Sequence, residues 1–187
     1  MPELFLDSLW PGLVAWTILY ISDYSLTIAC ARLYQAGARE KIAFEGSYEI
    51  TPYYQGDINA LRSLSPRFLA ALLFSLVWLS AVWWLAMESF FPAMYAFLLG
   101  GMILLELAIH VRHFRNLVLF RAIVGSDAVR GRIEYPRRLM LRMSSIEILA
   151  FSGLFAVVFA FTGSWFVLGG AVTCLSLAFK HFRLARK

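Results

Sequence analysis

The stretch FLAALLFSLVWLSAVWWLAM, residues 68–87, contains twenty residues and no charged side chain. Its apolar side chains lack the period-two alternation of a membrane β-barrel strand. A helix needs about 20 consecutive apolar residues to cross a bilayer, and its backbone groups must be paired within the membrane. The stretch therefore predicts a transmembrane helix.

The whole chain has the same character. Of its 187 residues, 60% are hydrophobic and 16% are charged, against roughly 25% charged residues in an average soluble domain. We therefore predict an all-α polytopic membrane protein, a five-transmembrane-helix bundle that forms a single membrane domain over residues 1–187. The predicted spans cover residues 9–33, 68–87, 91–111, 143–162 and 165–182, with long connections at 34–67 and 112–142.

The cations are distributed on one side of this topology. All 17 Lys and Arg residues belong to one side: fifteen fall in the two long connections or the C-terminal tail, and Arg32 and Lys180 lie at the adjoining ends of their spans. The opposite side carries only Glu3, Asp7 and Glu88. The positive-inside rule then places the N-terminus outside and the C-terminus in the cytoplasm, and we expect a plasma (inner) membrane location. The sequence pI of about 9.5 thus indicates contact with anionic lipid headgroups on the cytoplasmic face rather than with nucleic acid. The first span lacks a basic preceding region and predicts a retained anchor.

The two long connections resemble each other. FEGSYEITP, residues 44–52, aligns with VRGRIEYP, residues 129–136, when one residue is skipped. The resemblance predicts an internal helix–strand–helix repeat, with units at 9–87 and 91–162. We expect strands at 42–50 and 129–135 to pair antiparallel in a cytoplasmic β ribbon, where Glu45 and Glu49 would face Arg130 and Arg132.

Local signals refine the connections and the helix contacts. Asp57 predicts the N-cap of a short interfacial helix with Ile58, Leu61 and Leu64 on one face. Ser65 and Pro66 predict the start of the second span, and the third span is expected to continue to Gly125. The pairs Gly100–Gly101 and Gly169–Gly170 predict close packing between helices of one chain.

Three acidic residues fall inside predicted spans. Asp23, Glu106 and Glu147 lie 14 or 15 residues from the outer ends of their spans, about 21–23 Å deep at 1.5 Å per residue. His110 and His113 follow Glu106 on the same helical face. Charges at this depth are costly and are usually functional.

The first span predicts an inward polar face. Residues at three-four spacing share one stripe of this helix: Trp16, Tyr20, Asp23, Thr27, Cys30 and Tyr34. The candidates for ion or proton binding are Asp23, Glu106, His110, Glu147, Thr27 and Tyr20. Asp23, Glu106 and His110 together offer oxygen and nitrogen ligands suited to a divalent cation. Neutralisation by Arg32, Arg112 or Arg142 is the structural alternative, with Arg142 as the natural partner of Glu147.

Three classes of function remain open. The sequence has no P-loop, GxGxxG, CxxC or HExxH motif, and we expect a non-enzyme. The buried acids favour a cation- or proton-translocating channel or transporter, which would act as a homo-oligomer because five spans are few to enclose a pathway. A non-catalytic scaffold or subunit of a larger membrane complex is the first alternative, and a lipid-modifying membrane enzyme is the second.

Overall fold

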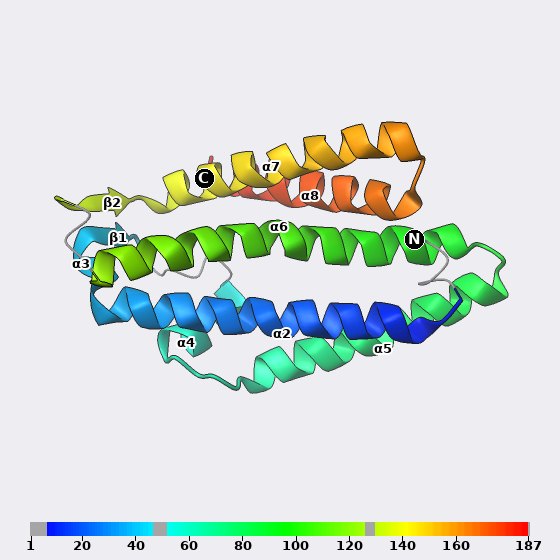
Figure 1. The fold of residues 1–187 in the computed structure, drawn as a ribbon, viewed down its shortest axis with the longest axis horizontal. Helices are drawn as coiled ribbons and strands as arrows, with labels where there is room; N and C mark the ends of the chain where they lie inside the picture. The colour runs from blue at the N-terminus through cyan, green and yellow to red at the C-terminus, as the bar shows by residue number, and fades with distance from the viewer. Residues whose placement is uncertain (1–6, 47–51, 126–129, 187) are drawn as a thin grey trace.

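A computed structural model of the chain describes residues 7–46, 52–125 and 130–186. Its long helices are α2 (Leu9–Leu33), α5 (Pro66–Glu88), α6 (Pro92–Gly125), α7 (Arg137–Thr162) and α8 (Trp165–Leu184). Each of these five is long and apolar enough to cross a membrane, α2 together with its continuation to Lys41. They lie lengthwise beside one another (Figure 1). The predicted fold class, a helical bundle with five helices that could cross a membrane, is confirmed.

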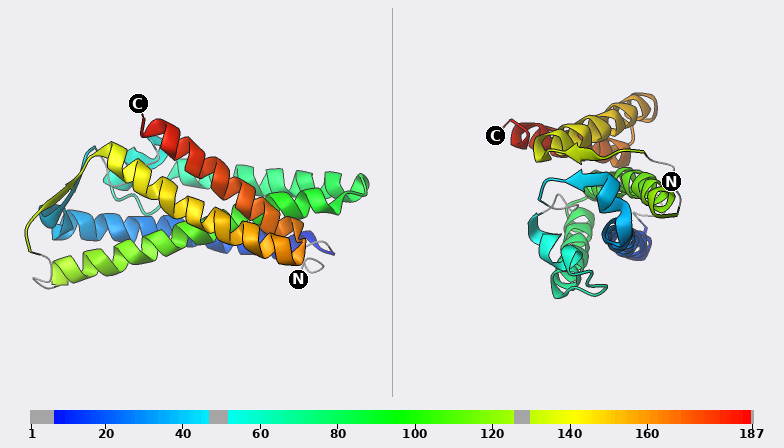
Figure 2. Two further views of the ribbon diagram at one scale, coloured as in Figure 1. Left: turned by 90° about the horizontal axis from the view of Figure 1, so that it is seen from above. Right: turned by 90° about the vertical axis from the view of Figure 1, so that its left-hand side faces the viewer.

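The helices are arranged around α6. On one side α6 packs against α2 and α5, and on the other it packs against α8. Helix α7 packs almost entirely on α8 and makes few contacts with α6, so α7 and α8 form a hairpin laid across the rest (Figure 2). This central position makes α6 the helix whose side chains can meet groups from both sides.

Glycines allow the close approach of α6 and α8. A Cβ atom placed on Gly100 would collide with the backbone of Phe166, and one on Gly169 would collide with the backbone of Phe97. Only residues without a side chain fit such a contact. The prediction that these glycines serve packing within one chain is confirmed.

The ends of the spans follow local capping signals. Ser65 accepts a hydrogen bond from the backbone N–H of Phe68 at 3.3 Å, and Pro66 occupies the first turn of α5, as predicted. Gly163 ends α7 in the left-handed conformation, with φ of 62°, where glycine carries no steric penalty. Helix α6 reaches Gly125 as expected. Helix α7 begins at Arg137, before the predicted start of the span at residue 143, so it includes part of the basic segment.

The β ribbon exists, but its predicted direction is wrong. Strands β1 (Ile42–Phe44) and β2 (Ile133–Tyr135) pair in parallel, with Phe44 opposite Tyr135. Their rings stack with centroids 5.6 Å apart, so aromatic packing rather than charge pairing accompanies this register. The cross-strand charge pairs are not formed by the described partners: Glu45 accepts from the backbone N–H of Arg137, and Arg132 pairs with Glu134 of its own segment.

The parallel pairing of the strands does not support the proposed repeat, which was expected to make them antiparallel. Residues 47–51 and Val129 of the aligned segments lie outside the described residues. The observed parallel pairing joins Ile42 to Ile133, whereas the repeat was expected to place the two strands antiparallel. The repeat therefore stays a prediction from sequence.

The short helix of the first connection lies earlier than predicted. Helix α4 spans Pro52–Asn59 and contains Asp57 in its last turn, so Asp57 is not its N-cap. Its carboxylate instead accepts hydrogen bonds from Ser65 at 2.6 Å and Arg62 at 3.1 Å. The helix does not continue through Leu61, whose backbone is left-handed with φ of 51°. Leu64 is exposed, so it does not share a helical face with Ile58 as predicted. The Asp57 carboxylate thus accepts from the Ser65 hydroxyl that begins α5 instead of capping the start of α4.

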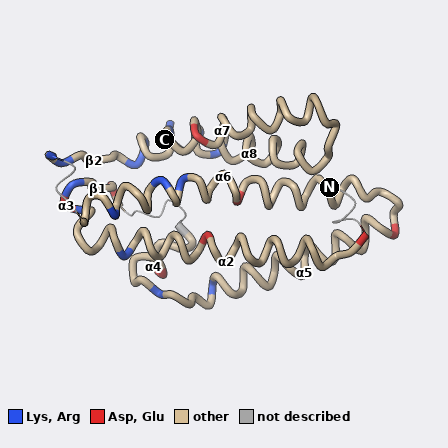
Figure 3. Tube along the Cα trace, viewed as in Figure 1, with Lys and Arg blue, Asp and Glu red and all other residues tan. Residues whose placement is uncertain are grey.

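Charge is unevenly distributed along the bundle. Lys and Arg gather toward the end that carries β1 and β2 (Figure 3). Before β1, α2 continues through a π-helical turn η1 (Tyr34–Ala38) and the short α3 (Arg39–Lys41). The basic end therefore contains both long connections of the chain, as the positive-inside argument requires of a cytoplasmic face.

Candidate functional site

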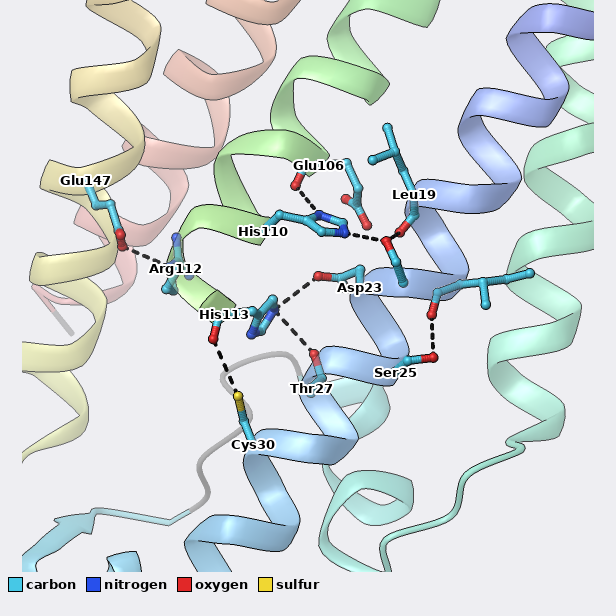
Figure 4. A network of polar contacts seen from close by, with 12 residues as sticks. Leu19, Asp23, Ser25, Thr27, Cys30, Glu106, His110, Arg112, His113 and Glu147 are labelled. Carbon is cyan, nitrogen blue, oxygen red and sulfur yellow. Dashed lines mark hydrogen bonds and ion pairs between the residues drawn. The ribbon is translucent and has the colours of Figure 1, made fainter. Parts of the chain in front are cut away.

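The predicted polar stripe of α2 faces the inside of the bundle. Trp16, Thr27 and Cys30 are buried, whereas Tyr20 and Asp23 are half-buried. Opposite them, α6 presents buried polar side chains at one-turn and two-turn spacing. The candidate site is therefore the interface between α2 and α6 in the half of the bundle nearer the β ribbon (Figure 4).

Asp23 meets a histidine of α6. The Nε2 atom of His113 lies 3.1 Å from Oδ1 of Asp23 and 3.3 Å from Oγ1 of Thr27. Among the described residues Oδ1 accepts no aligned hydrogen bond, and Nδ1 of His113 is buried without a hydrogen-bond partner. The contact between Asp23 and His113 is therefore electrostatic, and it lies beside the hydrogen bond between Nε2 of His113 and the Thr27 hydroxyl.

Glu106 is buried without a counter-charge. Its residue is 7% exposed, and within the described part of the chain its carboxylate makes neither a hydrogen bond nor an ion pair. The side chain extends between α6 and α2 (Figure 4) and lines the same cavity as Asp23. A buried carboxylate in this position requires a proton or a cation, because desolvation of an unpaired charge is costly.

His110 contacts a serine rather than the acids. Its Nδ1 atom lies 2.7 Å from the backbone carbonyl of Glu106, which can only accept, so Nδ1 carries the proton. In the neutral ring Nε2 then accepts from the hydroxyl of Ser22. That hydroxyl also lies 3.0 Å from the carbonyl of Leu19. The Ser22 hydroxyl therefore has two acceptors within reach, Nε2 of His110 and the carbonyl of Leu19.

Two tyrosines border the site. The hydroxyls of Tyr20 on α2 and Tyr54 on α4 lie 2.8 Å apart. Burial raises the pKa of Tyr54, so this phenol, which lies outside the spans, keeps its proton near neutral pH. Tyr20 therefore joins α4 to the polar stripe of α2.

Glu147 has the structural role that its sequence context suggested, with different partners. Its carboxylate pairs with Nε of Arg112 at 2.9 Å and with Nη1 of Arg115 at 3.2 Å, both from α6. Arg142, the expected partner, is exposed on α7. Helix α7 turns Glu147 toward α6 and Arg142 away from it, because the two positions lie five residues apart on a helix. Arg32 bonds Ser63 at 2.7 Å instead of an acid.

A cavity of about 870 Å³ connects these groups. Asp23, Glu106, Thr27 and Tyr20 line it, as do the following residues of α6, α7 and α8: Arg112, His113, Arg115, Glu147, Lys180 and His181. Ser22 and His110 are not among its lining residues. Five of the six predicted site residues thus line one cavity within a single chain, namely Asp23, Glu106, Glu147, Thr27 and Tyr20, and His110 does not.

The predicted metal set is not assembled as a ligand cluster. Over residues 7–46, 52–125 and 130–186, no group of three or more His, Cys, Asp or Glu side chains is placed to hold a metal ion. The reason is visible at His110, whose two ring nitrogens face the carbonyl of Glu106 and the hydroxyl of Ser22.

Sequence reasoning missed several partners at this site, Ser22 and Arg115 among them. His113 was part of the Glu106–His110–His113 spacing, but nothing in the sequence placed it opposite Asp23. Tyr54 was assigned no role, because its contact with Tyr20 depends on α4 folding back onto α2. The three-four spacing along α6 was the one available signal for His113.

These features define a class: a polytopic α-helical membrane-type protein with buried protonatable groups around an internal cavity. No protein family, curated protein or solved structure with which the chain was compared matches it.

Proposed function

We propose that this protein is a proton-coupled membrane transporter, in which Glu106 and the Asp23–His113 pair bind the coupled proton. The observation that carries the proposal is Glu106: a buried carboxylate beside a second acid, lining a cavity, with no partner among the described residues. A structural carboxylate at this depth would be paired, as Glu147 is. An unpaired one is retained at a cost, which favours a function.

A short proton path supports the same function. Glu106, His110 and His113 lie on one face of α6, and the first and last are about 10 Å apart along the helix at 1.5 Å per residue. Asp23 approaches His113 from α2, and Glu106 and His113 both line the cavity. Histidine and carboxylate groups in such proximity are the usual components of proton relays in membrane proteins.

The cavity also bears on the oligomeric state. It reaches Asp23 and Glu106 inside one chain, so the proposed transport does not depend on a pathway between copies. A homo-oligomer remains a prediction from sequence. Orientation follows the positive-inside rule, with the basic end and the cavity at the cytoplasmic face of the plasma (inner) membrane.

A second candidate function rests on Ser22 and His110. A serine hydroxyl on the Nε2 of a histidine whose Nδ1–H is held by a third group is the geometry of an activated nucleophile, which a lipid-modifying enzyme would use. The cavity does not include either residue, and this favours transport over the enzyme. For the scaffold alternative, the ion pairs of Glu147 provide support only at that position.

The test of the proposal is Glu106→Gln in proteoliposomes. A pH-sensitive dye inside the vesicles reports proton entry under an imposed potential. Glu106→Gln is expected to abolish protein-dependent proton flux, because the amide keeps the shape of the side chain but cannot carry a proton. Glu88→Gln, at an exposed acid at the end of α5, is the matched control and should keep the flux.

Thermal stability separates chemistry from folding. The amide of Glu106→Gln places no charge in the bundle, so the melting temperature in detergent should be equal to or above that of the wild type. Flux that is unchanged by Glu106→Gln would contradict the proposal.

A further inference from the structure

The cavity has two kinds of lining. Aromatic and aliphatic side chains from several elements form much of its wall, among them Phe44, Phe68, Phe120, Met140 and Leu177. Where α6, α7 and α8 face one another, the lining is basic instead: Arg112, Arg115, Arg137 and Lys180. A volume of about 870 Å³ falls within the roughly 300–1,000 Å³ of small-molecule sites. One pocket thus combines an apolar wall with a cluster of cations.

The cations of this cluster are incompletely neutralised. Glu147 uses its two oxygens for Nε of Arg112 and Nη1 of Arg115. The Nη2 atom of Arg112 is buried and finds no hydrogen-bond partner in the described chain. Lys180 lines the cavity and forms no ion pair with a described acid. Buried guanidinium donors without an acceptor are unfavourable, so the cluster is suited to an anion that supplies further oxygens.

The opposite lining decides what else the ligand contains. Asp23 and Glu106 contribute two carboxyl groups to the lining of the same cavity, and neither offers a counter-charge to a second anionic group. The remaining wall is apolar and aromatic, and it is suited to a hydrocarbon chain. An anionic group at one end and an apolar body therefore complement the two linings together.

We infer that the cavity binds a single-chain anionic amphiphile, with its carboxylate or phosphate at Arg112, Arg115 and Lys180 and its chain along the aromatic wall. The inference rests on the proposed transport and specifies the class of its cargo. Anion and proton would enter together, because a proton on Glu106 or Asp23 removes the negative charge that opposes an anion in the same cavity.

The test compares three probes on the purified protein in a neutral maltoside detergent at pH 7.5, by native mass spectrometry and titration. Lauroyl lysophosphatidate has the anion and the chain, monolaurin has the chain without the anion, and glycerol 3-phosphate has the anion without the chain. Lauroyl lysophosphatidate is expected to bind at least about tenfold more tightly than either of the others. Equal binding of monolaurin or of glycerol 3-phosphate would overturn the inference.

Variants localise the anion. Lys180→Gln and Arg115→Gln are each expected to weaken lauroyl lysophosphatidate binding by about tenfold, as loss of a charge-assisted contact does. Arg121→Gln, on the exposed face of α6 and outside the cavity lining, is the matched control and should have no effect. Unchanged binding in both cavity variants would overturn the inference.

A substitution that is expected to tighten binding shows that changes in affinity do not simply reflect loss of folding. Glu147→Gln releases Arg112 and Arg115 from their carboxylate, so the folded variant should bind lauroyl lysophosphatidate more tightly. Weaker or equal binding would contradict the assigned anion position.

All these binding measurements are made without a proton gradient. Lost binding with intact Glu106-dependent proton flux would refute the cargo alone, whereas intact binding with Glu106-independent flux would refute the proton site alone.

Discussion

The Nε2 atom of His113 on α6 lies 3.1 Å from Oδ1 of Asp23 on α2. The counter-group of Asp23 is thus a residue that can itself lose its charge, rather than a permanently charged arginine. The pair can exist as carboxylate with imidazolium, or with a proton removed, and its net charge differs between these states. Glu147, which is held by two arginines, lacks this freedom.

Asp23→Asn is expected to abolish proton flux with little effect on stability. The carboxylate is about a quarter exposed and accepts no aligned bond at Oδ1 from the described residues, so the loss in the free energy of unfolding should not exceed about 1 kcal/mol. Flux in proteoliposomes and melting in detergent are the two measurements. Retained flux together with a large loss of stability would show that Asp23 is a structural counter-charge.

Glu147→Gln is expected to lower the free energy of unfolding by about 1–3 kcal/mol, because it leaves Arg112 without a carboxylate in a partly buried site. Denaturation in mixed micelles measures this loss. The matched control is Glu134→Gln, whose pair with Arg132 is exposed on both sides and should leave stability unchanged. An equal effect of the two substitutions would contradict a structural role for the Glu147 pairs.

Gly169→Ala is expected to separate α6 from α8, because the added Cβ would collide with the backbone of Phe97. Overpacking of this kind costs about 1–3 kcal/mol, measured as a loss of thermal stability. Gly153→Ala is the matched control on α7, where a Cβ meets no atom within 4 Å, and it should stabilise by about 0.5–1 kcal/mol. A neutral Gly169→Ala would argue against the close α6–α8 contact.

Membrane orientation is tested by cysteine labelling. Cys30 and Cys174 are buried and are replaced by alanine to give a background without thiols. An impermeant maleimide added outside should modify Glu88→Cys and spare Arg132→Cys until the membrane is opened. The reverse pattern would place the basic end and its cavity outside.

The enzyme alternative is tested at Ser22 with a lipophilic fluorophosphonate. We expect no covalent labelling, because neither Ser22 nor His110 lines the cavity in which an acyl substrate would be held. Labelling that Ser22→Ala removes would instead establish an activated serine. Glu106→Gln serves as the control, since it leaves both members of the pair in place.

The positions of the helices could be read from sequence because each depends on its own segment. Long uncharged runs such as 68–87 must be helical in a membrane, Ser65 and Pro66 act within one turn, and the glycines of α6 and α8 have no side chain to separate two backbones. The same reasoning placed Asp23, Thr27 and Tyr20 on one inward stripe, since helical periodicity alone defines a face.

Other features depended on contacts between segments distant in sequence. The parallel pairing of β1 and β2 brings Phe44 onto Tyr135, and the contact between Tyr20 and Tyr54 joins α2 to α4. His113 rather than His110 reaches Asp23 because the rotation of α6 against α2 decides which of two polar positions faces the carboxylate. That rotation results from the packing of every side chain between the helices, so it was settled only when the whole bundle was assembled.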